Sequence, residues 1–345
     1  MAKRIVVVTS DVPFVEGGHL VIARELVARL REYGYESELV TTPQNSFSRL
    51  LRAYLATSLT DLREAGDGGP VDGVVSLRFP SYAVKHARHS CWLNHRMREY
   101  YDLWPRFRNQ LSWKGRIKQR LRRFAIHRID EFCLDHRVKK LYAQSRTIQA
   151  RLSAWGGHTS EVLYPPAIVR PYRTEGYGDY FFAVSRLVEL KRFELLVRAA
   201  AEAKVACVLA GEGPQMESLK ALIKELGAEK LVRLVGRVGD DELLTHYARC
   251  RAVVFPAYGE DYGLVTLEAF SSAKPVITCS DSGGPAEIVA HEKTGLIVGP
   301  EPTPLAEALR RLADDAGLAE TMGRAAVEEA ARHTWQDAVE KLVEW

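Results

Sequence analysis

Two glutamates, eight residues apart, flank a glycine-containing turn in the C-terminal part of the chain. In the segment Gly259-Glu-Asp-Tyr-Gly-Leu-Val-Thr-Leu-Glu-Ala-Phe270, Glu260 precedes the turn and Glu268 lies in the helix expected after it. The first amides of that helix belong to Gly263, Leu264 and Val265. Amides at a helix N-terminus attract a phosphate, whereas carboxylates accept hydrogen bonds from sugar hydroxyls. The spacing predicts a site for a sugar linked to a diphosphate; a loop acid followed by a partly exposed helix glutamate is the alternative.

A second charged turn follows the strand expected at 180–184. Its sequence, Ser185-Arg-Leu-Val-Glu-Leu-Lys-Arg192, contains Arg186 and Lys191. A departing nucleotide diphosphate accumulates negative charge, which cations in this loop would stabilise. Arg186 offers a planar fork for phosphate oxygens and Lys191 a compact point charge, although an ordinary basic turn would look the same.

The segment 259–270 resembles the E-x7-E signature of the family-four retaining glycosyltransferases, also described as glycosyl transferases group 1, which have the GT-B architecture. The resemblance extends over nearly the whole chain and is most specific in its C-terminal half. It implies that Glu260 contacts the hydroxyls of the donor sugar near the reacting centre, as a candidate catalytic residue. It also implies that Glu268 binds the nucleotide ribose. Arg186, Lys191 and the amides at 263–265 would then bind the diphosphate.

Two further loops are weaker signals by themselves. Each ends an expected strand and begins a helix, one at Ala210-Gly-Glu-Gly-Pro214 and the other at Gly236-Arg-Val-Gly-Asp240. In the family such loops contact the nucleotide, which makes Gly211, Arg237 and Val238 nucleotide-binding candidates. The loop at 280–287 is interpreted as a support for the site.

In the N-terminal half, Glu16-Gly-Gly-His19 occupies the first crossing from strand to helix. Gly17 and Gly18 would let backbone amides face the diphosphate from across the cleft; a simple turn is the alternative. The spacing lacks the G-x-G-x-x-G pattern, which argues against NAD binding.

His95 ends the strand expected at 90–95 and so would lie at the carboxyl edge of the first sheet. There it would hydrogen-bond a donor hydroxyl or position the acceptor, and the family often has a functional histidine in this region. A structural or solvated histidine is the alternative. Neighbouring residues form an aromatic and cationic patch, suited either to stacking on a sugar or to packing; they are Arg96, Arg98, Tyr100, Tyr101 and Trp104.

Strands and helices alternate in both halves of the chain, which indicates parallel sheets covered by helices. The strands expected in the first half are 4–10, 37–42, 71–77, 90–95 and 139–145, with a long basic helix at 113–136. Those expected in the second half are 180–184, 205–210, 231–235, 252–256, 275–279 and 295–298. Asp240 is expected to cap a helix at 242–248, and 304–345 is expected to be helical throughout.

Three prolines in Tyr164-Pro-Pro-Ala-Ile-Val-Arg-Pro171 interrupt this pattern. We therefore expect an α/β protein of two Rossmann-like doubly wound domains facing a central cleft, as in GT-B enzymes. The N-terminal acceptor-binding domain would span 1–165, a linker 166–171, and the nucleotide-sugar-binding domain 172–330. A C-terminal helix at 331–345 would pack back toward the N-terminal domain.

Charge is distributed unevenly along the 345 residues. Residues 1–170 contain 28 Lys and Arg against 16 Asp and Glu, which leaves 20 against 28 in the remainder of the totals of 48 and 44. The basic excess peaks in Lys114-Gly-Arg-Ile-Lys-Gln-Arg-Leu-Arg-Arg123 and suits a phosphate-bearing acceptor, an anionic membrane or nucleic acid. A solvated helix face is an equal alternative. Nucleic acid is not expected, because no recognition module accompanies the charge.

The sequence indicates a protein without a membrane span, a disulfide framework or a metal site. No apolar run approaches the length of a span, the N-terminus reads as a buried strand and not a signal peptide, and the five cysteines are scattered. We expect a cytoplasmic protein, with peripheral contact at the inner face of the membrane. Neither a cofactor nor a metal is expected, because the cations and the helix N-terminus would supply the positive charge.

The predicted activity is that of a retaining glycosyltransferase moving a hexose from a nucleotide diphosphate donor to a glycan or lipid-linked acceptor. The Glu-Asp-Tyr-Gly form of the donor loop resembles mannosyltransferase-like members, which suggests cell-envelope polysaccharide synthesis, while UDP, GDP and other donors stay open. A nucleotide-sugar epimerase on the same scaffold and a two-lobed ligand-binding protein are the alternatives.

Overall fold

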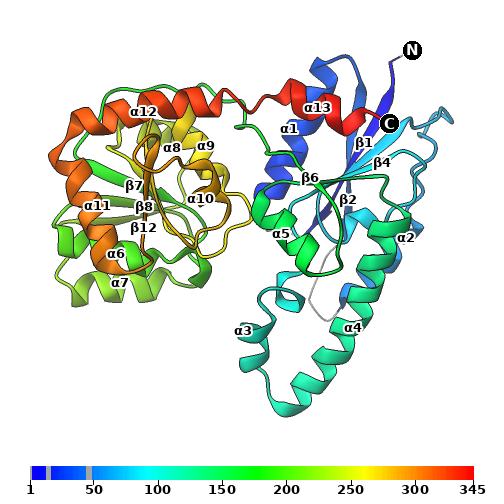
Figure 1. Cartoon of the computed structure of the whole chain (residues 1–345), viewed down its shortest axis with the longest axis horizontal. Coiled ribbons are helices and arrows are strands. Elements are labelled where there is room, and N and C mark those ends of the chain that lie inside the picture. The colour runs from blue at the N-terminus through cyan, green and yellow to red at the C-terminus, as the bar shows by residue number, and fades with distance from the viewer. Residues whose placement is uncertain (1, 13–16, 44–48) are drawn as a thin grey trace. The chain divides into compact units, whose positions relative to one another are not determined.

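The computed structural model describes residues 2–12, 17–43 and 49–345. The chain divides into two compact units, one formed by 1–165 with 334–345 and the other by 166–333 (Figure 1). Each unit contains a parallel sheet, and the predicted α/β fold of two doubly wound domains is confirmed.

Within the described residues, the first unit has six parallel strands in the order β2-β1-β3-β4-β5-β6. The strands are β1 (Arg4–Asp11), β2 (Glu36–Pro43), β3 (Gly73–Ser76), β4 (His89–Leu93), β5 (Lys140–Ala143) and β6 (Glu161–Val162). The helices are α1 (Gly18–Glu32), α2 (Leu50–Leu59), α3 (Trp104–Asn109), α4 (Trp113–His136), α5 (Arg146–Ala154) and α13 (Trp335–Val343). Strand order reverses between β1 and β3, which makes their carboxyl ends the expected place for a ligand.

The second unit, all of which is described, has the strand order β12-β11-β10-β7-β8-β9, again with parallel pairs. The strands are β7 (Tyr180–Val184), β8 (Ala206–Ala210), β9 (Val232–Gly236), β10 (Val253–Phe255), β11 (Val276–Cys279) and β12 (Gly295–Val298). The helices are α6 (Phe193–Ala203), α7 (Met216–Glu225), α8 (Asp240–Arg249), α9 (Leu264–Ser271), α10 (Gly284–Ile288), α11 (Pro302–Asp314) and α12 (Ala316–Ala330). Here the strand order reverses between β7 and β10.

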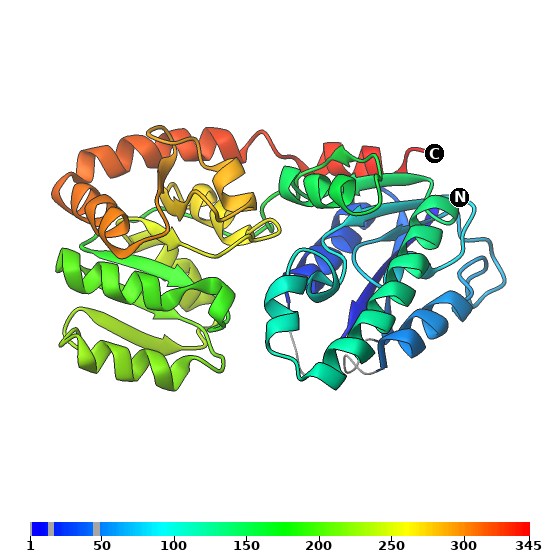
Figure 2. The same cartoon turned by 60° about the horizontal axis from the view of Figure 1, so that its bottom comes forward.

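Helices cover both faces of the second sheet (Figure 2). The core between α6, α7, α11 and one face of the sheet is built from apolar side chains, among them Phe181, Leu196, Leu209 and Leu309. On the other face, α9 packs against β10 and α12. Because β7 and β10 are central strands with helices on both sides, the loops at their carboxyl ends rest on a rigid support.

The C-terminal segment differs from the expected continuous helix at 304–345. It forms three helices, α11, α12 and α13, and residues 331–334 separate the last two. Asp315 and Thr334 begin α12 and α13 as N-caps, each accepting a hydrogen bond from an amide three residues later. The last helix packs within the first unit, where Trp335 meets Trp92 edge-on at 6.1 Å between ring centroids.

Asp240 was expected to be a helix N-cap, and this expectation is wrong. Gly239 occupies the cap position and Asp240 is the first residue of α8. Its carboxylate instead lies 3.3 Å from the guanidinium of Arg170. None of the described helices combines the length and the apolar character needed to cross a membrane.

Candidate functional site

The loops that follow β7 and β10 meet at the point where the strand order of the second unit reverses. The first loop is Ser185–Arg192 and the second is Pro256–Gly263. The amide of Tyr258 donates to the carbonyl of Leu190 at 2.7 Å, which joins them directly. Open parallel sheets bind ligands at this kind of position.

Lys191 and Glu260, predicted from separate motifs, form one ion pair in this loop cluster. Lys191 Nζ lies 2.6 Å from Glu260 Oε2, and the side chains are 13% and 22% exposed. The ammonium also lies 5.0 Å from the centre of the Phe255 ring. An ammonium has three donor hydrogens, so the pair leaves donor capacity for a phosphate beside the carboxylate.

The backbone around Glu260 is held by the loop at 280–287. The Glu260 amide donates to Ser282 at 2.8 Å, and the Gly284 amide donates to the carbonyl of Glu260 at 3.0 Å. Gly283 has a φ of 71°, and a Cβ there would lie 2.4 Å from the Glu260 carbonyl oxygen. A glycine is therefore required at this contact, and the segment supports the loop as the sequence had indicated.

Arg192 holds these loops together, and sequence reasoning did not identify it. Its guanidinium forms a two-pronged contact with Asp281, at 2.6 and 2.9 Å, and donates from Nε to the carbonyl of Pro256 at 2.6 Å. The partners lie 64 to 89 residues away along the chain. Its only sequence signal is its position directly after Lys191.

The helix predicted to begin near Gly263 begins at Leu264, with Gly263 as its N-cap at a φ of 81°. A Cβ on Gly263 would lie 2.7 Å from the Pro285 ring. The first amides of a helix have no acceptor within it. The amides of Leu264 and Val265 are two such groups. They lie at the N-terminus of α9, beside the loop that carries Glu260.

Glu268 is more deeply buried than the partly exposed helix glutamate considered from the sequence. It is 8% exposed, and the Tyr247 hydroxyl donates to its Oε2 at 2.8 Å. Arg170 approaches the other oxygen to 3.7 Å. Burial raises the pKa of the Glu268 carboxyl, and Tyr247 and Arg170 act in the opposite direction because both favour the ionised form.

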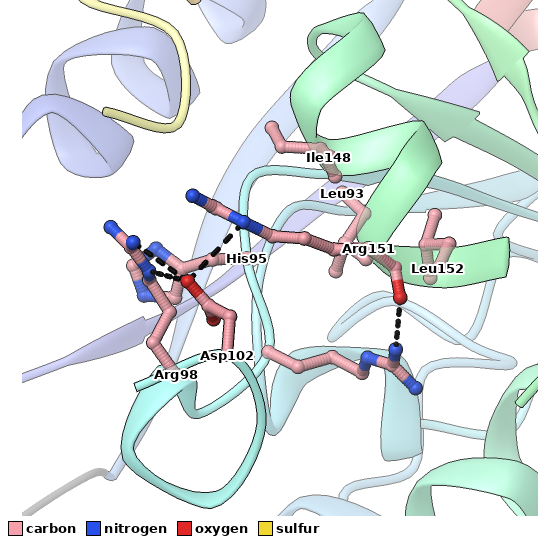
Figure 3. Close-up of a pocket in the computed structure, with 8 residues that line it drawn as sticks. Leu93, His95, Arg98, Asp102, Ile148, Arg151 and Leu152 are labelled. Carbon is pink, nitrogen blue, oxygen red and sulfur yellow. Dashed lines mark hydrogen bonds and ion pairs between the residues drawn. The ribbon is translucent and has the colours of Figure 1, made fainter. Parts of the chain in front are cut away.

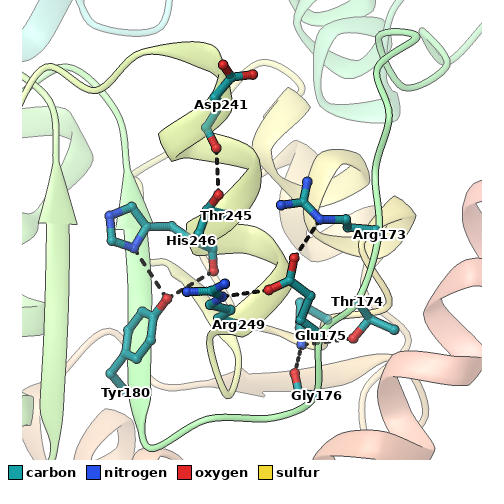
Figure 4. A network of polar contacts seen from close by, with 10 residues as sticks. Arg173, Thr174, Glu175, Gly176, Tyr180, Asp241, Thr245, His246 and Arg249 are labelled. Carbon is teal, nitrogen blue, oxygen red and sulfur yellow. Dashed lines mark hydrogen bonds and ion pairs between the residues drawn. The ribbon is translucent and has the colours of Figure 1, made fainter.

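Tyr247 and Arg170 were not identified from the sequence. The segment that follows Arg170 is fixed to the second unit by a polar network (Figure 4). Glu175 accepts from Arg173 at 2.7 Å and from Arg249 of α8 at 2.6 Å. Arg170 therefore approaches Glu268 from a segment that these hydrogen bonds hold in place.

The remaining nucleotide-binding candidates lie at the same edge of the second sheet. Gly211 has a φ of 134°, and a Cβ there would lie 1.8 Å from the carbonyl oxygen of Ser185. The loop after β8 thus lies directly against the loop that carries Arg186, whose side chain is exposed. Arg237 and Val238 follow β9 at the end of the strand order.

The N-terminal candidates lie in the first unit. Gly18 is the exposed first residue of α1, and Gly17 is its N-cap. Glu16, which opens the predicted turn, lies outside the described residues. β4 ends at Leu93, so His95 belongs to the following loop and does not end the strand as expected.

His95 lines a pocket with a cationic character (Figure 3). Asp102 Oδ2 accepts from Arg98 at 2.7 Å and lies 3.3 Å from Arg151 Nε. The lining consists of Leu93, His95, Arg96, Arg98, Asp102, Ile148, Arg151 and Leu152. Three arginines against one carboxylate give the lining of this pocket a net positive charge.

For Tyr100 and Tyr101, the packing alternative of the predicted patch holds. Tyr100 and Tyr101 are 1% and 3% exposed, so they pack in the core and have no face for a sugar. The Tyr101 hydroxyl donates to buried Asp130 at 2.6 Å, and the Arg96 guanidinium lies 4.0 Å over the Tyr101 ring. A run of alternating aromatic and basic residues cannot distinguish these arrangements.

No group of three or more His, Cys, Asp or Glu among the described residues is placed to hold a metal ion. The carboxyl-end edge of the second sheet carries two carboxylates, Glu260 and Glu268, each with a nearby cation, Lys191 and Arg170 respectively. The N-terminus of α9 lies at the same edge. This set can bind an anion next to a polyol.

Comparison with known proteins bears on both units. Residues 169–329 match the family model described as Glycosyl transferases group 1. A D-inositol 3-phosphate glycosyltransferase from Corynebacterium diphtheriae is 36% identical over 171 residues, 46% of this chain and 40% of that protein. A GDP-mannose-dependent alpha-(1-6)-phosphatidylinositol monomannoside mannosyltransferase from Mycobacterium tuberculosis is 34% identical over 176 residues, 47% of this chain and 46% of that protein. The chain thus spans less than half the length of these curated relatives.

Solved structures show the same fold over almost the whole chain. Sucrose-phosphate synthase from Thermosynechococcus elongatus has a TM-score of 0.77 at 17% identity, covering 98% of this chain and 97% of that one. HepE from Anabaena, solved with UDP and glucose, has a TM-score of 0.71 at 17% identity and covers 97% of both chains. HepE has also been solved with UDP-glucose. At these identities the likeness concerns the GT-B fold.

Proposed function

We propose that this protein transfers a hexose from a nucleotide diphosphate to an acceptor with retention of anomeric configuration. The match of residues 169–329 to the family model described as Glycosyl transferases group 1 supports this proposal. The observation that carries this proposal is the pair of Lys191 and Glu260, 2.6 Å apart at the strand-order reversal of the second unit. A cation and a carboxylate in contact there match a donor in which a phosphate adjoins a sugar.

In this proposal the second unit binds the donor. Glu268 accepts hydrogen bonds from the ribose, and Arg186, Lys191 and the first amides of α9 bind the diphosphate. Glu260 accepts from the sugar hydroxyls. When the bond between the sugar C1 and the phosphate oxygen breaks, the acceptor oxygen bonds to C1 on the same face and its proton passes to the departing phosphate. The residues contribute positioning and charge stabilisation, and their positive charge takes the part that a metal would play.

The first unit would bind the acceptor. Gly18 would approach the diphosphate, and His95 would orient the reacting hydroxyl. The pocket beside His95, with Arg98 and Arg151 around Asp102, favours an acceptor that carries an anionic group. The names of both curated relatives are consistent with this, because D-inositol 3-phosphate and phosphatidylinositol monomannoside contain phosphate.

The finer assignment is a mannosyltransferase-like enzyme that acts on a glycan or lipid-linked acceptor in cell-envelope polysaccharide synthesis. It would work in the cytoplasm, at the inner face of the membrane. One relative is named for GDP-mannose, whereas HepE was solved with UDP-glucose. These names support a UDP- or GDP-hexose as the donor, and a donor screen separates the two from each other and from other nucleotide sugars.

The test is slow hydrolysis of nucleotide sugars by the purified chain, with the released nucleotide identified. We expect one donor to be hydrolysed, and Glu260→Gln to lower the rate about a hundredfold or more while nucleotide affinity changes little. Glu217→Gln is a matched control, because the Glu217 side chain is 83% exposed on α7. Equal rates in the Glu260 variant and the control would remove Glu260 from the site.

The two alternative activities give different products. An epimerase would convert the donor into a second nucleotide sugar without an acceptor, and a ligand-binding protein would leave every donor intact. Either result, obtained with a chain that binds nucleotide normally, would overturn the proposal.

A further inference from the structure

The first half of α4 carries a row of large apolar side chains that face solvent. Trp113, Ile117, Leu121 and Phe124 are 68%, 56%, 68% and 64% exposed. At about 100° per residue they fall within an arc of about 80° on the helix surface. Apolar side chains gathered in this way mark a contact surface, whereas isolated ones do not.

Cations border this row on both sides. Between 113 and 128 the sequence has seven Lys and Arg and no Asp or Glu. The same angular arithmetic places Arg116 and Arg120 along one border and Lys114 and Lys118 along the other. We call the four apolar residues and these four cations the α4 surface; all eight are exposed.

The opposite side of α4 is anchored within the first unit. Gln119 accepts from the Tyr100 hydroxyl at 2.8 Å, and Arg123 donates to the Tyr100 carbonyl at 2.7 Å. The fully buried residues of α4 all lie in its second half, at Ile126, Asp130, Cys133 and Leu134. Figure 1 shows the first half of α4 and α3 extending beyond the sheet of their unit. The α4 surface is thus held outward on a fixed support.

We propose that the α4 surface binds the headgroup region of an anionic lipid bilayer. A helix with Trp, Phe and Leu on one side and Lys and Arg at its borders lies in the plane of a membrane interface. Its cations then meet lipid phosphates, and their alkyl stems extend along the apolar layer. An open groove adjoining the row would admit such a phosphate; it is lined by Arg120, Arg123, Phe124, His127, Arg128 and Glu131.

Charge complementarity favours the bilayer over a second copy of the chain. A symmetric dimer brings the same patch of both copies together, so the cations of one α4 surface would face those of the other. An anionic bilayer supplies the opposite charge. The inference deepens the proposed contact with the inner face of the membrane. It does not depend on the proposed sugar transfer, because the α4 surface shares no residue with the donor or acceptor candidates.

The test is co-sedimentation of the full chain with vesicles of phosphatidylcholine, alone or mixed with phosphatidylglycerol. We expect binding only to the mixed vesicles, weakening as salt is added. Leu121→Ser with Phe124→Ser should lower the partition coefficient about tenfold. Lys118→Gln with Arg120→Gln should lower it about twentyfold at low salt. An unchanged midpoint of denaturant unfolding shows that these variants are folded.

Two variants serve as matched controls. Leu55→Ser removes a leucine that is 61% exposed on α2, and Lys220→Gln removes a lysine that is 57% exposed on α7. Both should bind the mixed vesicles like the unaltered chain. The proposal is overturned if the chain stays in the supernatant, if the controls lose as much binding as the α4 variants, or if Leu121→Ser abolishes a dimer instead of vesicle binding.

Discussion

Removal of the Tyr247 hydroxyl tests how the buried carboxylate of Glu268 is held. Tyr247 is fully buried and meets Phe182 edge-on at 5.4 Å. Tyr247→Phe keeps that ring contact and removes only the donor to Glu268 Oε2, which lies 2.8 Å away. The change therefore isolates one hydrogen bond.

The expected magnitude follows from the charge and burial of the acceptor. Removing a donor from a buried ionised group costs about 1.5–3 kcal/mol. Arg170 is 3.7 Å from the other carboxylate oxygen and cannot replace the lost bond without moving. We therefore expect a loss of about 2 kcal/mol in the free energy of unfolding at pH 8.

This loss should depend on pH. Burial raises the pKa of Glu268 above its ordinary value near 4.5, and the Tyr247 hydroxyl opposes that rise. The variant should therefore have a still higher Glu268 pKa. A carboxyl with a raised folded pKa contributes stability that is present at low pH and lost as pH rises through that pKa. The difference in free energy of unfolding between the unaltered protein and Tyr247→Phe should be small near pH 4.5. It should grow as the pH rises above the folded pKa of Glu268.

The assays are denaturant unfolding from pH 4.5 to pH 8 and titration with UDP and GDP. If Glu268 binds ribose, the variant should bind the preferred nucleotide about fivefold more weakly, or about 1 kcal/mol. Tyr177→Phe is the control, because the Tyr177 hydroxyl donates to the neutral carbonyl of Ala273 at 2.7 Å in the same unit. If both variants show the same pH-independent loss, the account of Glu268 is refuted, and unaltered nucleotide affinity would refute its ribose role.

Three further predictions concern the loops. Arg192→Ala should lower donor hydrolysis about tenfold or more, since the two-pronged contact with Asp281 and the bond to Pro256 hold the Glu260 loop; wild-type rates would contradict this. Gly211→Ala should lower the free energy of unfolding by about 2–4 kcal/mol in denaturant titrations, because its Cβ would lie 1.8 Å from a carbonyl oxygen, and an unchanged midpoint would show that the loop yields. Transfer should continue in excess chelator; a loss restored by manganese would mean that a metal supplies charge at the diphosphate.

The sequence by itself determined the features that depend on neighbouring residues. The sequence predicted β1, α4 and the strands of the second unit close to their observed bounds, because strand and helix patterns are local. The turn at Gly263 and the start of α9 are likewise local, since glycine at a positive φ begins the helix there. The E-x7-E spacing lies within one such segment, which is why the sequence could indicate both the loop and a resemblance that the family model matches over residues 169–329.

Local pattern was insufficient where a side chain had several possible partners. Tyr100 and Tyr101 suited either stacking on a sugar or packing, and the structure selects packing, because the Tyr101 hydroxyl reaches Asp130, 29 residues away, and both rings are buried. The Asp240 carboxylate could cap a helix, but Gly239 occupies the cap position of α8 and the carboxylate lies 3.3 Å from the Arg170 guanidinium.

Only the tertiary structure decided which distant groups meet. Lys191 and Glu260 are 69 residues apart, and Arg192 and Asp281 are 89 apart. Those pairs form because the strand order places β10 beside β7 and β11 beside β10, an arrangement set by the packing of helices on both faces of a sheet. Periodicity specifies that a strand exists but not which strand lies beside it, so the partners of a side chain are fixed only when the sheet assembles.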